Sequence, residues 1–128
     1  NTAGDYTVHS SVADCGMTGR KLAVDFYGAA APLGGGSPWT KDATKADLTL
    51  NLYARRLAVE NLADNDEVWV YLSSCIGQSC LPSAVLKARK GKDFTERNLQ
   101  IESRPSVLIE KFGLNKPIFA DLCRNGLI

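Results

Sequence analysis

Residues 71–89, with the sequence YLSSCIGQSCLPSAVLKAR, decide how the fold of this chain is interpreted. A strand-like run enters the stretch and a basic run leaves it, and between them lie Cys75 and Cys80, separated by four residues. This order predicts a long β-hairpin with a cysteine-flanked loop at its tip. It raises the question of what the two thiols are for.

The segments around this loop alternate between apolar and polar residues, as half-buried strands do. In residues 66–75 one face is apolar, and the opposite face carries Trp69 and Tyr71. Residues 46–56 (ADLTLNLYARR) alternate in the same way, which predicts a second strand there. Residues 83–103 predict a long, polar-faced strand that can bend at Gly91. Residues 55–67 fit either a continued strand after a bulge or a short helical turn.

The two ends of the chain complete the predicted fold. Residues 5–12 and 20–28 are strand-like runs joined by a glycine-containing turn, which predicts an N-terminal β-hairpin. Residues 28–38, rich in Gly, Ala and Pro, predict a surface loop. Residues 103–113 predict a helix with Ser103 as its cap, Pro105 in its first turn and Gly113 as its stop. Residues 115–128 predict another, with Asn115, Pro117 and Gly126 in these roles.

These elements predict an α+β fold with an antiparallel sheet and two short C-terminal helices. Because isolated helices of this length are marginal in water, each must pack its apolar side on another surface, and the leucine–valine face of the sheet is the expected one. Helices there leave the other face of the sheet open. The open face is expected to show aromatic and basic side chains, which suit base stacking and phosphate contact, or to be an ordinary solvated surface. Its expected members are Thr49, Asn51, Tyr53, Arg55, Trp69, Tyr71, Lys87 and Arg89.

Composition bounds the function. The chain has 128 residues, of which 45% are hydrophobic and 23% charged, which indicates one globular domain over residues 1–128. The net charge of +1 does not indicate a strongly basic nucleic-acid binder. No apolar run is long enough to span a membrane, and no signal peptide is visible.

The reactive residue types give little sign of catalysis. His9 is the only histidine, and no nucleophile or acid stands at a recognisable spacing from it, so we expect a protein that is not an enzyme. The cysteines are not grouped as zinc ligands are, and we expect neither a metal nor a cofactor. An even number of cysteines, four, favours an oxidising destination and allows three disulfide pairings.

In the order of these elements the chain resembles the coat proteins of single-stranded RNA bacteriophages (levivirus type). The likeness rests on the N-terminal hairpin, the glycine-rich passage, the alternating strands, the cysteine-flanked loop followed by proline (CIGQSCLPSAV) and the helical ending. It implies a structural capsid protein. Two subunits would join into a homodimer with one continuous sheet, and the C-terminal helices of each would cover the sheet of its partner. Dimers would form an icosahedral virion, assembled in the bacterial cytoplasm, around the RNA.

The resemblance also implies residue roles. An RNA hairpin would bind the inner sheet face, for translational repression and packaging, through Thr49, Asn51, Trp69, Tyr71, Lys87 and Arg89. Arg89 stands where many members of that family have an aromatic residue, although an arginine plane also stacks on bases. In the resemblance Cys75 and Cys80 would link neighbouring subunits by disulfides; a local bridge between the two is the other possibility. The alternative function is a secreted or periplasmic, disulfide-stabilised, β-rich binding or inhibitor domain.

Overall fold

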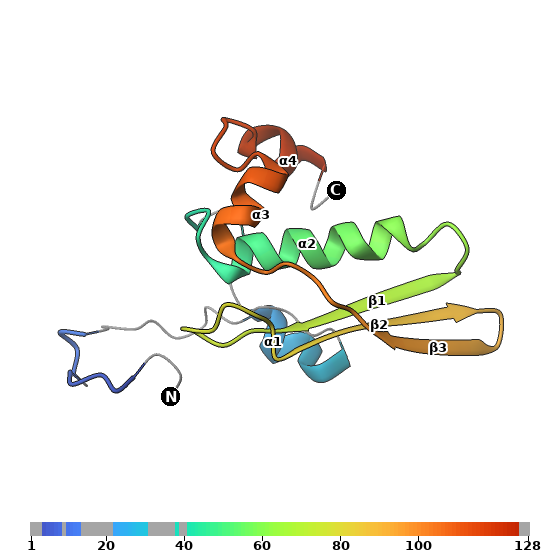
Figure 1. Cartoon of the computed structure of the whole chain (residues 1–128), viewed down its shortest axis with the longest axis horizontal. Helices are drawn as coiled ribbons and strands as arrows, with labels where there is room; N and C mark the ends of the chain where they lie inside the picture. Colours follow the sequence, from blue (N-terminus) through green and yellow to red (C-terminus); the bar gives the residue numbers. More distant parts are fainter. Residues whose placement is uncertain (1–3, 9, 14–21, 31–37, 39–40, 126–128) are drawn as a thin grey trace.

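The computed structural model describes the chain except for residues 1–3, 9, 14–21, 31–37, 39–40 and 126–128 (Figure 1). Along the described chain, helices come first, the three strands follow, and two further helices come last. In order they are α1 (Leu22–Tyr27), the short 3₁₀ helix η1 (Gly28–Ala30), α2 (Ala46–Glu60), β1 (Glu67–Ser73), β2 (Ser83–Lys90), β3 (Asp93–Asn98), α3 (Pro105–Phe112) and α4 (Phe119–Asn125).

The sheet is antiparallel, with its three strands in the order β1-β2-β3. The strand expected around Trp69 is confirmed as β1, and Ser73 pairs with Ser83 at the end of the hairpin that carries the cysteine loop. The long strand expected over residues 83–103 is instead two strands. At Gly91 the backbone has a φ of 60°, which favours glycine, so the chain turns back there rather than bending.

The prediction of a strand over residues 46–56 is wrong, because these residues begin the fifteen-residue helix α2. Leu48, Thr49, Leu52 and Tyr53 are its buried residues, and their spacing follows the 3.6-residue turn of a helix. Leu48 and Leu52, two of the three leucines in the alternation that predicted a strand, belong to this helical pattern, whereas Leu50 is not one of the buried residues of α2. Residues 55–60, which fitted either a strand or a helical turn, form the second half of α2.

The second strand of the expected N-terminal hairpin is also contradicted, because α1 occupies most of residues 20–28. The first strand, expected over residues 5–12, has no regular secondary structure where it is described. Most of the expected turn between them, and Cys15 with it, lies outside the described residues. The spacing of apolar residues over residues 22–27 fits both a strand and a helix, so this spacing alone does not distinguish the two.

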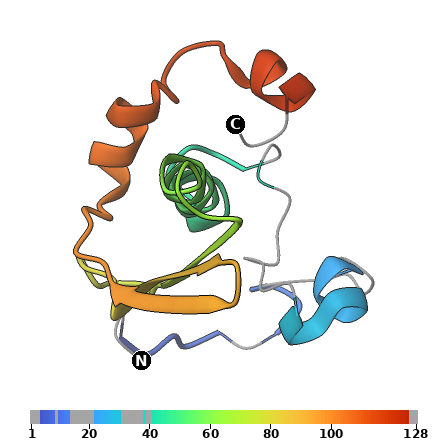
Figure 2. The ribbon, with the colours of Figure 1, turned by 90° about the vertical axis from the view of Figure 1, so that its right-hand side faces the viewer.

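The molecule is layered, with α2 between the sheet and the C-terminal helices (Figures 1 and 2). One side of α2 lies over β1 and β2, where Ala84, Leu86 and Ala88 are buried. Its other side forms a core in which Leu48 and Leu52 meet Leu114. Full burial of a leucine such as Leu48 contributes about 1.5–3 kcal/mol to folding.

The C-terminal helices therefore do not cover their own sheet, as expected from their apolar sides, but pack on α2. Gly113 ends α3 as predicted, with a left-handed backbone. Ser103 is not the cap: residue 104 holds that position, and the Ser103 hydroxyl donates to the Ser79 carbonyl at 3.4 Å. Asn115 does not cap α4, which begins four residues later, and Gly126 lies outside the described residues.

The described helices include none that is both apolar enough and long enough to cross a lipid bilayer.

Candidate functional site

A pocket lined by both polar and apolar residues lies where the start of α2 meets the β1–β2 loop, and we call it the α2–loop pocket. Its volume is about 500 Å³, which is in the range of small-molecule sites. Three segments that are far apart in the sequence form its walls. They contribute Thr44, Lys45, Ala46, Asp47, Thr49 and Leu50; Ser74, Cys75, Ile76, Gly77, Gln78, Cys80 and Leu81; and Ser103 and Pro105.

The α2 wall of this pocket carries fixed and partial charges. Lys45 occupies the N-cap of α2 without a side-chain hydrogen bond to the helix, so the first backbone N–H groups have no cap from that residue. Asp47 lies in the first turn, where a carboxylate complements the positive end of the helix dipole, and it pairs with the Lys41 amino group at 3.4 Å. This wall can therefore attract an anionic group and also accept a hydrogen bond.

The segment before α2 is held by a local turn. Asp42 accepts hydrogen bonds from both the backbone N–H and the hydroxyl of Thr44. These bonds, the hydroxyl bond first, lower the pKa of the Asp42 carboxyl below its ordinary value. Thr44 is thereby fixed at the mouth of the pocket, next to Lys45.

The loop wall of the pocket carries sulfur. Cys75 and Cys80 are free thiols and exposed. The Gln78 N–H donates to the Cys75 carbonyl at 3.2 Å, and Gly77 has a φ of 85°, so the chain turns sharply between the two cysteines. The expected inter-subunit link between these cysteines remains a prediction, because a single chain does not test it.

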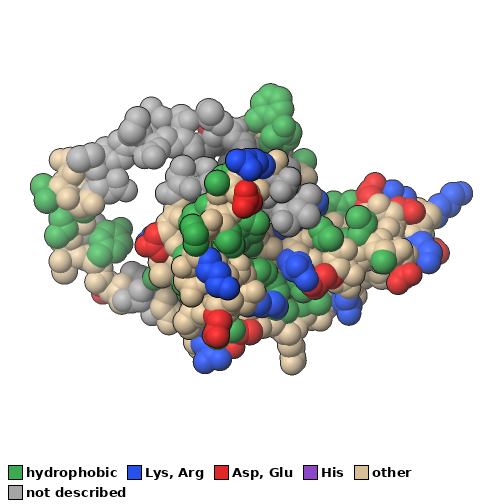
Figure 3. All heavy atoms as spheres, turned by 90° about the horizontal axis from the view of Figure 1, so that it is seen from above, with side chains coloured by type: hydrophobic (Ala, Val, Ile, Leu, Met, Phe, Trp, Pro, Cys, Tyr) green, Lys and Arg blue, Asp and Glu red, His purple; other side chains and the backbone are tan. Residues whose placement is uncertain are grey.

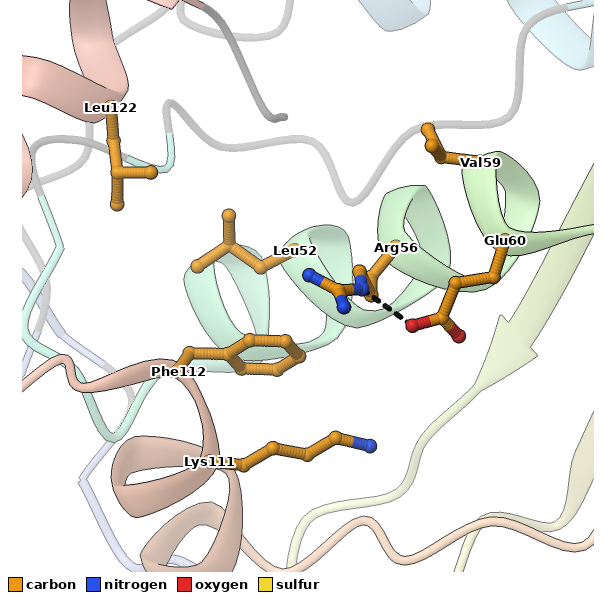
Figure 4. A pocket seen from close by; sticks show the side chains of 7 residues that line it. All are labelled: Leu52, Arg56, Val59, Glu60, Lys111, Phe112 and Leu122. Atoms are coloured by element: carbon orange, nitrogen blue, oxygen red, sulfur yellow. Dashed lines mark hydrogen bonds and ion pairs between the residues drawn. The ribbon is translucent and has the colours of Figure 1, made fainter.

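A second hollow, of about 430 Å³, lies between α2, α3 and α4 (Figure 4). Leu52 and Phe112 point into it from two helices, and Leu122 faces them from α4. Charges stand at its margin: Arg56 pairs with Glu60 along α2, and the Lys111 amino group lies 4.1 Å from the centre of the Tyr53 ring. The remaining lining residue is Val59. Its apolar floor suits hydrocarbon more than a polar substrate.

The residues predicted to bind RNA are separated into two groups. Trp69, Tyr71, Lys87 and Arg89 come together on the face of the sheet opposite α2, and the pairing of Trp69 with Lys87 places these two side by side. Trp69 and Tyr71 are 36% and 37% exposed. We call this surface, which also includes Glu67, Phe94 and Glu96, the open sheet face.

Thr49 and Asn51 do not belong to the open sheet face. Both lie in α2, where Thr49 is 1% exposed and donates its hydroxyl hydrogen to the Lys45 carbonyl. The Asn51 side chain donates to the Asp47 carbonyl within the same helix. The predicted face failed for these two residues because it assumed a strand at this position.

The cations of the open sheet face are already paired. Lys87 lies 2.9 Å from Glu96, and Arg89 lies 2.7 Å from Glu67. The hydrogen bond that Lys87 donates to Glu96 raises the pKa of Lys87, and the bond that Arg89 donates to Glu67 raises the pKa of Arg89. Seen from the helical side, acidic and basic side chains are also interspersed (Figure 3). On the described surface, basic side chains therefore have acidic side chains beside them.

Comparison with known proteins gives a consistent family. The model of the "S-adenosylmethionine synthetase, C-terminal domain" matches residues 8–128. The S-adenosylmethionine synthase of Pelagibacter ubique (strain HTCC1062) is 36% identical over an alignment 134 residues long. The alignment covers 98% of this chain and 34% of that protein. The enzyme of the same name from Methylobacterium nodulans (strain LMG 21967 / CNCM I-2342 / ORS 2060) is 34% identical over 128 residues, or 94% of this chain and 33% of that protein.

A third relative is the S-adenosylmethionine synthase of Petrotoga mobilis (strain DSM 10674 / SJ95), 33% identical over 98% of this chain and 33% of that protein. The chain thus spans about one third of the length of these curated relatives. No solved structure gives a significant match.

These matches overturn the resemblance to bacteriophage coat proteins, which depended on an order of strands that the helix α2 interrupts. The capsid function, the coat-protein assembly with its RNA hairpin, and the virion location are corrected with it. The secreted or periplasmic binding domain is not supported either. The expectation of a protein that is not an enzyme is wrong, because the matched relatives are enzymes.

The polar residues of the α2–loop pocket were not found by sequence reasoning. Lys45 and Asp47 precede and begin a helix, and acidic residues in a first helical turn are a recognisable signal. That signal was hidden because residues 46–56 were interpreted as a strand. With α2 recognised, both residues would have been placed at a helix start.

Proposed function

Because the chain belongs to the S-adenosylmethionine synthetase family, we propose that it acts as the C-terminal domain of an enzyme that forms S-adenosylmethionine. The observation that carries this proposal is the family match over almost the whole chain. The same match distinguishes it from a binding domain, because every relative described above is named as a synthase.

The product defines the reaction. A new bond must join the thioether sulfur of methionine to the 5′ carbon of an adenosyl group, which leaves a sulfonium cation. The donor must therefore lose a good leaving group from that carbon, and the triphosphate of ATP is one. The sulfur supplies the electron pair for the new bond, and the electrons of the broken carbon–oxygen bond leave with the triphosphate.

We assign the α2–loop pocket to substrate binding in this reaction. Lys45 and the start of α2 provide positive charge suited to a triphosphate, since helix N-termini and lysines both stabilise phosphate oxygens. Asp47 provides an acceptor for a hydroxyl or ammonium group of a substrate. The hollow between α2, α3 and α4 is less suited to these polar substrates, because its floor is apolar.

The test uses the complete polypeptide that contains this chain. Purified protein is incubated with methionine and the magnesium complex of ATP, and S-adenosylmethionine is measured by mass spectrometry. We expect product to form in proportion to enzyme. Failure to form product, in a mixture where a known synthase is active, would contradict the proposed function.

The pocket is tested separately by Lys45→Met and Asp47→Asn. Each removes an interaction with a charged group, worth about 1.5–3 kcal/mol, and we expect kcat/KM to fall about tenfold or more. Lys116→Met, at an exposed lysine before α4, is the matched control and should keep the full rate. Unchanged kinetics in both pocket variants would move the substrate site elsewhere and leave the family function intact.

A further inference from the structure

The two cysteines of the β1–β2 loop lie at matching positions on its two sides. Regular pairing of the hairpin ends at Ser73 and Ser83. Cys75 stands two residues beyond the first of these and Cys80 three residues before the second. Because paired strands leave the sheet side by side, we expect the two cysteines to lie near each other across the loop.

The chain turns sharply between the two thiols. The hydrogen bond from the Gln78 N–H to the Cys75 carbonyl closes a turn, and the positive φ of Gly77 supports it. Both thiols are exposed and both line the α2–loop pocket. Both residues are therefore accessible to an oxidant in solution.

We propose that Cys75 and Cys80 are a modification site, at which a peroxide forms a reversible disulfide within the loop. One thiol releases its proton, the resulting thiolate attacks a peroxide oxygen, and the oxygen–oxygen bond breaks to give a sulfenic acid and hydroxide, which takes up the released proton to become water. The second thiol then attacks the sulfenic sulfur, and the sulfur–oxygen bond breaks to release another water. In total, two thiols are oxidised to one disulfide and one hydrogen peroxide is reduced to two waters.

The disulfide has a structural consequence for the pocket. The Ser103 hydroxyl, which donates to the Ser79 carbonyl, ties the loop wall to the segment before α3, and a bridge would add a covalent restraint to this wall. A restrained loop adapts less well to a substrate on the facing wall, where Lys45 and Asp47 lie. We therefore expect oxidation to slow the synthase reaction; this part rests on the proposed function.

The first experiment tests the bond itself. The complete polypeptide is treated with hydrogen peroxide, free thiols are alkylated, and the protein is digested with trypsin. Residues 57–87 contain no internal lysine or arginine, so both cysteines fall in one peptide. We expect this peptide to escape alkylation, to be lighter by two hydrogen atoms, and to become alkylatable after dithiothreitol.

Single cysteine substitutions identify which two thiols form the disulfide. Cys123→Ser removes an exposed thiol on α4 and should leave the bridged peptide unchanged, whereas Cys75→Ser and Cys80→Ser should each abolish it. The proposal is overturned if both loop thiols stay as alkylatable after peroxide as before. It is also overturned if they are recovered mainly in crosslinks to other chains.

The second experiment follows S-adenosylmethionine formation before peroxide, after peroxide and after dithiothreitol. We expect the unsubstituted enzyme to lose activity several-fold and to recover it. The Cys75→Ser, Cys80→Ser double variant should show no change on peroxide addition, whatever its starting rate. A bridged enzyme with an unchanged rate would overturn the effect on the pocket. An enzyme without activity before oxidation would count against the proposed function, and the peptide experiment would still decide the disulfide.

Discussion

Glu102 shows how one exposed carboxylate orders the entrance to a helix. It accepts hydrogen bonds from the Arg104 backbone N–H at 2.9 Å and from the Arg104 guanidinium at 3.0 and 2.7 Å. Since residue 104 is the N-cap of α3, these bonds fix the direction in which that helix starts. The Arg104 side chain is the main reason that the pKa of Glu102 falls from its ordinary value of 4.5 to about 2.

This pKa predicts how stability depends on pH. The carboxylate is favoured in the folded chain, so its contribution is fully present above pH 4.5 and is lost as the pH falls toward 2. Glu102→Gln cannot titrate. We therefore expect the difference in melting temperature between the two proteins to be constant near neutral pH and to shrink below pH 4.5. Thermal unfolding followed by circular dichroism between pH 7 and 2 measures it.

The matched control for this effect is Arg104→Gln, which keeps the backbone donor and removes the guanidinium. NMR titration of the Glu102 carboxyl carbon should give a midpoint about 2 in the unsubstituted protein and a higher one in this variant. A midpoint near 4.5 in the unsubstituted protein would contradict the hydrogen-bond arrangement.

At the level of elements, the end of α3 determines whether the chain re-enters the core. Gly113 has a φ of 64°, its N–H donates to the Glu110 carbonyl, and the Leu114 N–H donates to the Ile109 carbonyl. This pattern is a helix C-cap that reverses the chain. It delivers Leu114, which is 5% exposed, into the cluster with Leu48 and Leu52.

Gly113→Ala should therefore destabilise the chain because alanine disfavours the left-handed backbone at this position, and not because its Cβ would clash with a neighbouring atom. A Cβ at this position would meet the Lys116 Cδ at an ordinary 3.8 Å. The left-handed backbone costs an L-residue about 1–2 kcal/mol, and we expect the free energy of urea unfolding to fall by that amount. Gly113→Asn should cost less, because asparagine tolerates this conformation. Equal losses in the two variants would argue against a conformational cause.

The elements also show what the sequence could predict. Residue 69 and its neighbours alternate over a whole strand, and Gly113 follows a helical period, so β1 and the end of α3 were found. Residues 46–60 fit both a strand period and a helical period, and the buried positions of the folded chain, which include Tyr53 beside Leu52, follow the helical one. The α2–loop pocket could not be predicted, because its walls come from three separated segments that meet only after folding.

For the whole molecule, the open sheet face is a partly exposed surface on the side of the sheet opposite α2. Its aromatic residues Trp69 and Tyr71 stand beside ion pairs. Aromatic residues are enriched where a surface meets another protein segment, and charged residues belong to the polar rim of such an interface. On the proposed function, we infer that another protein segment packs against this face.

The double variant Trp69→Ser, Tyr71→Ser tests this inference. Trp69 and Tyr71 are 36% and 37% exposed in the chain alone, so its unfolding free energy should fall by the burial that their rings already have there. The complete polypeptide should lose more stability than the chain alone, and should lose S-adenosylmethionine formation, because a further contact is lost. Leu62→Ser, at a residue 45% exposed after α2, is the matched control and should affect neither. Equal behaviour of the two variants in the complete polypeptide would contradict the inference.

The outer edge of β3 has a consequence for solubility. All six of its side chains are exposed, and no further strand pairs with it in the described part of the chain. A bare edge of this kind invites intermolecular pairing and aggregation. Asp93, Glu96 and Arg97 keep that edge hydrated, and their charges oppose the stacking of neighbouring molecules into fibrils.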